Sequence, residues 1–251
     1  MNTAKSCTSS PPLNAWLYLM DAYEGTYKRL AKNNLSDQEL DGLLNTAQID
    51  FDAARPEPLI ELLSNQDRSV RRLGLSIYGR LSAKSFPALN AALALIDDES
   101  DWSRGYILDG ALCYPKELSS KQISIVLSIA ADPSIVVRHK VAVVIGCIDC
   151  EALEPAISLL SALPNWSEYE RGLTLNRLGP DWLSLLLKTA FADNGVSSTF
   201  ALGAIDRLAR SGQIDQLPVY EDESLHADLL LGNANRLINR RKLVRRPGAL
   251  S

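Results

Sequence analysis

The sequence predicts an all-α fold, a right-handed α-α superhelix or solenoid built from about five to six helix pairs. Apolar residues recur at three- and four-residue spacings in segments of about 12 to 18 residues, as on one face of a helix. Strand signals are weak, because no Asp-Gly or Asn-Gly turn separates two alternating apolar runs. Helices of this length joined by short turns form a bundle or a solenoid, and an internal repeat favours the solenoid.

The repeat is marked by four arginines separated by 33, 34 and 33 residues: Arg71, Arg104, Arg138 and Arg171. The first three each follow an aspartate closely: Asp67, Asp101 and Asp132. Glycine stands eight residues beyond three of the four, at Gly79, Gly146 and Gly179, where it would let neighbouring backbones approach closely. A structural period explains why these residues recur together.

Each repeat is interpreted as two helices. The first members are predicted at 56–64, 86–96, 121–130, 153–163 and 182–191. The second members are predicted at 69–81, 103–112, 135–148, 169–178 and 199–209. In the fifth pair Ala201 stands in place of the arginine, only 30 residues beyond Arg171, and such drift is common in terminal repeats.

Helices that lack the repeat signature are expected to cap both ends of the repeats, within a single domain spanning 1–251. Residues 12–50 hold two helical segments without the repeat signature. At the other end, a loop at 215–223 precedes a last helix at 224–244. Terminal caps of this kind shield the end repeats of a stacked array from water.

Local signals mark several helix starts. Two candidate capping boxes pair Ser36 with Glu39 and Ser119 with Gln122, so that each side chain satisfies a free backbone donor. Proline, whose missing N–H costs nothing in a first turn, lies near other predicted starts: Pro12, Pro56, Pro87, Pro133 and Pro155.

The stretch Asp132-Pro-Ser…Val-Arg138 and the 33–34-residue period resemble HEAT-like repeats of the armadillo superfamily, including the short HEAT-like kind found in bacteria. The resemblance covers about residues 54–212. It implies a curved array whose second helices line a concave face, where such proteins hold a partner. It also implies that the arginines and aspartates bond within and between repeats.

Composition limits the classes of partner and the cellular location that are expected. Apolar residues are 46% and charged residues 22% of the chain, as in a folded soluble protein. A net charge of -4 argues against a general nucleic-acid binder, which needs a cationic field along the phosphates. Neither an apolar secretion signal nor a membrane-length apolar run occurs, so a cytoplasmic protein without membrane contact is expected.

The four arginines admit two interpretations. They form either a cationic stripe for a phosphate or acidic partner, or internal bonds to nearby aspartates and turn carbonyls. Because aspartates accompany three of the four, the internal role is favoured. Candidate partner contacts are therefore sought on the predicted second helices, outside this pairing: Arg72, Arg80, Tyr106, Asp109, His139, Lys140 and Arg177.

Cys147 and Cys150 form a C-x-x-C sequence, which in redox proteins opens a helix whose N-terminus lowers the thiol pKa. Here the motif is expected to end a helix, where the dipole has the opposite sign. A zinc site would need two further ligands, with Cys113 the best third thiol and only His139 and His226 as histidines. Small buried core residues are favoured, and no metal or cofactor is expected.

Two kinds of charged run have simple interpretations. The acidic runs at 97–99 and 221–223 lie in polar segments, so they are interpreted as solvated faces. The segment 236–246 holds six positive charges, which favours cations at a helix C-terminus over a handle for nucleic acid or an acidic partner. No motif of a serine hydrolase, a P-loop protein or a zinc protease occurs.

The sequence therefore predicts a non-catalytic scaffold that binds another protein on its concave face. One version is a bacterial immunity or antitoxin-type inhibitor, because a small acidic helical protein suits a basic toxin domain. The alternative is an enzyme, either a HEAT-like DNA glycosylase or a bilin-attaching lyase. A glycosylase would use aromatic side chains and a catalytic aspartate, for which Asp101-Trp102 and Asp181-Trp182 are candidates. Tryptophans packed between helices are favoured instead.

Overall fold

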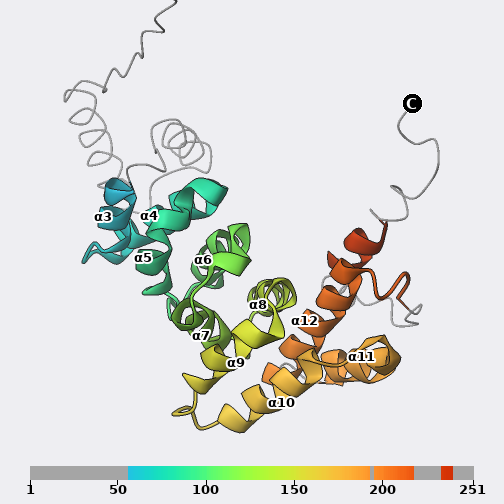
Figure 1. The fold of residues 1–251 in the computed structure, drawn as a ribbon. Coiled ribbons are helices and arrows are strands. Elements are labelled where there is room, and N and C mark those ends of the chain that lie inside the picture. Colours follow the sequence, from blue (N-terminus) through green and yellow to red (C-terminus); the bar gives the residue numbers. More distant parts are fainter. Residues whose placement is uncertain (1–55, 193–194, 218–232, 240–251) are drawn as a thin grey trace, which may run out of the picture.

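The computed structural model describes residues 56–192, 195–217 and 233–239, and every regular element in these ranges is helical (Figure 1). The α-helices are α3 (Glu57–Leu63), α4 (Arg68–Arg80), α5 (Leu89–Leu93), α6 (Asp101–Cys113), α7 (Ser120–Ser128), α8 (Ile135–Cys147), α9 (Cys150–Ser158), α10 (Trp166–Asn176), α11 (Leu183–Ala192) and α12 (Val196–Ser211). Short 3-10 helices are η1 (Ser82–Ala88), η2 (Pro115–Glu117) and η3 (Pro180–Trp182). The predicted all-α class is confirmed. None of the described helices is long and apolar enough to cross a membrane.

All ten helices predicted for the repeats are present, and four of their starts, those of α5, α9, α10 and α12, lie three residues from the predicted positions. Pro87 lies inside η1, so α5 begins later than the predicted position 86. Pro155 lies inside α9, which begins at Cys150 after an extended Asp149 instead of at 153. The capping box of Ser119 and Gln122 is confirmed at the start of α7. Ser36, Glu39 and the predicted caps at 12–50 lie outside the described residues, as does most of 224–244, of which 233–239 is helical.

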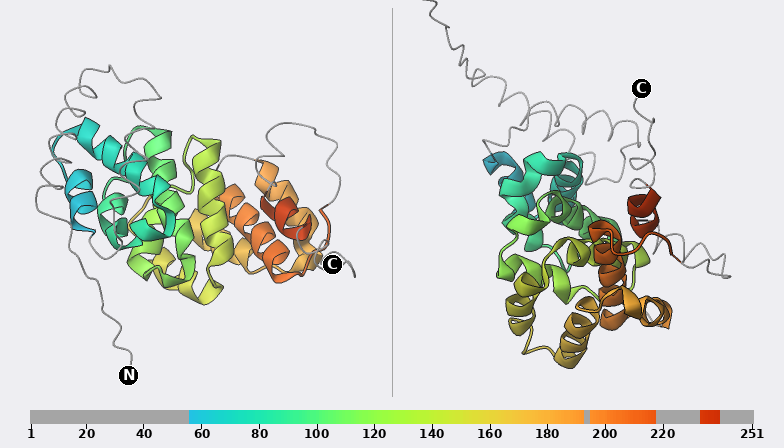
Figure 2. Two further views of the ribbon diagram at one scale, coloured as in Figure 1. Left: turned by 90° about the horizontal axis from the view of Figure 1, so that it is seen from above. Right: turned by 45° about the vertical axis from the view of Figure 1, so that its right-hand side comes forward.

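The helices form two rows. The first row contains α3, α5, α7 and α9, which contact one another in that order. The second row, called the inner row here, contains α4, α6, α8 and α12 in contact in that order. Apolar side chains between the rows are fully buried, among them Leu75, Ile107 and Val144. Figure 2 shows the helices following one another along the molecule from α3 at one end to α12 and 233–239 at the other.

The inner row departs from the predicted order at its fourth member. The resemblance implies that all the second helices, α10 included, line one face, but α12 packs against α8 more extensively than any other pair of the described helices pack. The crossing is close because it is made by glycines: a Cβ on Gly146 would lie 2.9 Å from the carbonyl oxygen of Gly203. α10 instead packs against α9 and α12, with the Phe200 ring over Gly172.

Candidate partner-binding surface

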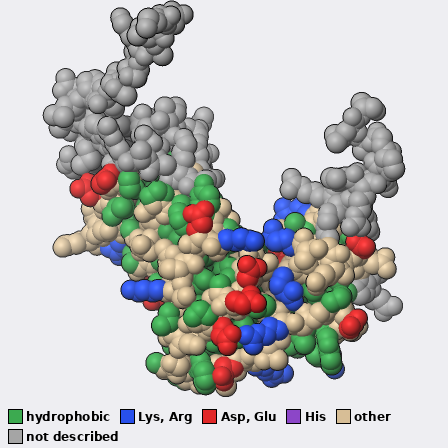
Figure 3. All heavy atoms as spheres, viewed as in Figure 1, with side chains coloured by type: hydrophobic (Ala, Val, Ile, Leu, Met, Phe, Trp, Pro, Cys, Tyr) green, Lys and Arg blue, Asp and Glu red, His purple; other side chains and the backbone are tan. Residues whose placement is uncertain are grey.

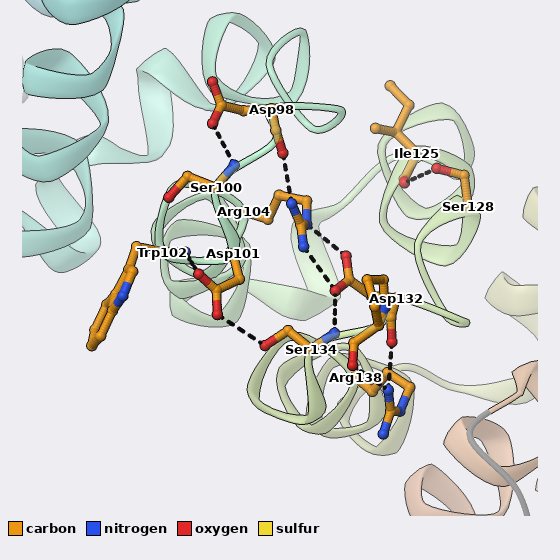
Figure 4. A network of polar contacts seen from close by, with 11 residues as sticks. Asp98, Ser100, Asp101, Trp102, Arg104, Ile125, Ser128, Asp132, Ser134 and Arg138 are labelled. Carbon is orange, nitrogen blue, oxygen red and sulfur yellow. Dashed lines mark hydrogen bonds and ion pairs between the residues drawn. The ribbon is translucent and has the colours of Figure 1, made fainter.

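The turns that lead into α4, α6 and α8 share one pattern of hydrogen bonds, which holds each turn against the helix that follows it. A side-chain oxygen of Asn65, Asp98 or Asp132 accepts a hydrogen bond of 2.8 Å from the backbone N–H two residues on. The carbonyl oxygen of the same residue accepts one from the arginine six residues on, at 2.8, 2.6 and 2.5 Å: Arg71, Arg104 and Arg138. Figure 4 shows two of the three copies. Each arginine thus fixes the turn that precedes its own helix.

The internal role predicted for the arginines is confirmed for these three. Of the two kinds of partner predicted, nearby aspartates and turn carbonyls, the carbonyl oxygens of Asn65, Asp98 and Asp132 accept these hydrogen bonds. An arginine on a helix points back toward the helix N-terminus, so it reaches the turn carbonyl before the start of the helix. The fourth arginine, Arg171, is exposed on α10, and Asn165 six residues before it gives that helix no side-chain cap.

Arg104 also joins two repeats. Its Nε and Nη2 atoms lie 2.6 and 2.9 Å from the two carboxylate oxygens of Asp132, in the turn before the next inner helix. Both side chains are buried, with exposed fractions of 10% and 4%. The hydrogen bonds that Arg104 donates to this carboxylate raise the pKa of its guanidinium above the ordinary value. The pair is therefore part of the internal structure and not available to a partner.

The centre of the inner row brings together three of the predicted contact residues. The Lys140 ammonium group on α8 lies 2.7 Å from the Asp109 carboxylate on α6 and donates to the Gly105 carbonyl at 3.0 Å. Tyr106 lies over Gly79 of α4, where an added Cβ would meet its ring at 2.3 Å. All three side chains remain partly exposed, so they can still contact a partner.

The other predicted contacts lie elsewhere or are already engaged. Arg72 was placed outside the internal pairing, but its guanidinium lies 3.4 Å from the Asp98 carboxylate because that turn faces α4. Arg177, at the end of α10, forms a 2.8 Å ion pair with Glu154 of α9, in the first row. His139 is half-buried on α8, and the side chain of Arg80 lies outside what the structure describes.

Sequence reasoning missed a second polar cluster, at the α12 end of the inner row. Asp206 is only 4% exposed; its carboxylate accepts a hydrogen bond of 2.5 Å from Asn233 and lies 3.9 Å from Arg210. Burial raises the pKa of Asp206 to about 6, while Asn233, Arg210 and Arg236 act in the opposite direction. No sequence spacing reveals this cluster, because its members come from α12 and the separate helix 233–239.

The C-x-x-C residues flank a helix boundary. Cys147 ends α8 as expected, but Cys150 opens α9, which corrects the prediction that the motif simply ends a helix. Ile148 and Asp149 between them are extended, which puts the two Cα atoms about 10 Å apart. A disulfide needs less than about 7 Å, so the pair cannot bridge in this conformation. Burial raises the pKa of the Cys147 thiol, and the described residues contain no group of three metal-ligating side chains.

Two tryptophans lie where sequence reasoning did not expect them. Trp102 is 74% exposed and points away from the polar network of Figure 4, and Trp182 is 54% exposed. The prediction that the tryptophans pack between helices is therefore wrong for both. Their neighbours Asp101 and Asp181 are exposed as well, which leaves no enclosed aspartate beside either ring.

The described surface carries mixed charge. In Figure 3, basic and acidic side chains alternate down the middle of the molecule, below an indentation of its upper edge. The four inner helices hold nine Arg and Lys residues against three Asp, although the chain as a whole has a net charge of -4. Most of the cations described above already bind a carboxylate or a carbonyl oxygen.

Comparison with known proteins finds no match among family models, curated proteins or solved structures. The function must therefore be argued from the geometry of the chain itself.

Proposed function

We propose that the protein is a non-catalytic scaffold, a HEAT-like solenoid whose inner row binds another protein. The observation that carries the proposal is the partly exposed Asp109–Lys140 pair beside Tyr106, at the centre of the inner row of helices. Partly exposed charges and a tyrosine are typical of protein interfaces, where they supply specificity and contact area.

The charge of the inner row supports a protein partner over a nucleic acid. A nucleic-acid groove needs cations free to replace counterions along many phosphates. Arg104 binds Asp132, Arg72 binds Asp98, and Lys140 binds Asp109, so these cations would have to break internal bonds to reach a phosphate. Ion pairs that remain half-exposed can instead contact a protein surface that carries both positive and negative side chains in complementary positions.

Within this class we propose an immunity or antitoxin-type inhibitor that blocks a basic toxin domain. The support is the net charge of -4 in a chain of 251 residues. An acidic inhibitor would speed association with a basic enzyme and cover its active site.

Affinity capture from the native host tests the protein-binding function. The bait is the full chain, as wild type and as two charge-matched variants. Asp109→Asn with Lys140→Gln removes the central pair, and Glu154→Gln with Arg177→Gln removes an ion pair of the first row.

A partner that wild type and the first-row variant retain, and that the central variant loses, supports the proposal. Equal retention by both variants, with circular dichroism showing intact folds, contradicts a role for the inner row. Turnover of a damaged-base DNA substrate by the wild-type protein would contradict a non-catalytic scaffold.

A further inference from the structure

We draw no further inference here: the strongest candidate, the exposed apolar surface patch of Trp102 and Val136 at the adjoining N-terminal ends of α6 and α8, carries none because nothing in the described part of the structure shows what covers it.

Discussion

The two halves of the inner row are held together in different ways. From α4 to α8, polar bonds dominate: each helix is preceded by a turn whose carbonyl binds an arginine, and Arg104 links to the next turn through Asp132. Between α8 and α12, close packing dominates, with Gly146 against Gly203. The C-terminal end of α10 is fixed from α12, where Arg207 donates to the carbonyls of Asn176 and Leu178 at 3.1 and 2.7 Å.

This difference shows what keeps the repeat regular. The turns before α4, α6 and α8 each contain an Asn or Asp side chain and an arginine that bond to the turn backbone, and these three helices lie side by side. Arg171 and Asn165 keep the sequence spacing but do not make that bond pattern, and α10 does not take the place beside α8. An arginine at the repeat spacing is therefore not accompanied at α10 by the bonded turn that precedes α4, α6 and α8.

The largest effect is expected from Arg104. Arg104→Met leaves the Asp132 carboxylate buried without its cation, which should lower the free energy of unfolding by about 3–5 kcal/mol. Arg171→Met, at the equivalent position of α10, should change it by less than about 0.5 kcal/mol because the side chain is exposed. Urea denaturation of both variants measures the contrast. Equal losses would mean that the two regions are not held differently.

The second-largest loss of stability is expected at Gly146, where α8 crosses α12. An alanine at Gly146 would place its Cβ 2.8 Å from the Cβ of Asp206, so Gly146→Ala should cost about 1–3 kcal/mol of unfolding free energy. Gly105→Ala is the control, because its Cβ would meet only the Lys140 ammonium at 3.5 Å. That substitution should stabilise α6 by up to about 1 kcal/mol. Thermal unfolding that shows both variants destabilised alike would contradict close packing as the cause.

Asp206 gives the packing of α8 against α12 a pH dependence. Its folded-state pKa of about 6 lies above the ordinary 3.8, so the folded protein holds this proton more tightly than the unfolded chain. Stability is therefore lost as pH rises from about 4 through 6, by about 2–3 kcal/mol. Asp206→Asn should match wild type near pH 4 and exceed it by that amount above pH 7. A difference that stays constant across this range in chemical denaturation would refute the assignment.

The smallest effect is expected from a local helix cap. Ser119 and Gln122 satisfy each other's backbone donors at the start of α7, so Ser119→Ala should cost about 1 kcal/mol. Ser100 begins α6 without a side-chain cap bond, and Ser100→Ala should cost less than about half of that. A cost at Ser119 as large as that at Arg104 would mean that caps, and not links between repeats, set the stability of this half.

The sequence by itself determined which segments are helices. Apolar spacing and the 33–34-residue period predicted all ten helices of the repeats, and the Ser119 capping box was predicted to the residue. These features are local, because a helix buries one face and satisfies its own backbone within a few residues. The bond partners of the arginines were open to the same reasoning: Asn65, Asp98 and Asp132 also recur every 33–34 residues, six before an arginine.

Only the tertiary structure decided which helices are neighbours. The choice of α12 over α10 beside α8 depends on how closely two glycine-containing faces can approach, which no period reveals. The same choice buries Asp206 and brings Asn233 within hydrogen-bond distance of its carboxylate across 27 residues of sequence. Burial and long-range contacts set the pKa of Asp206, so this polar cluster exists only once the chain has folded.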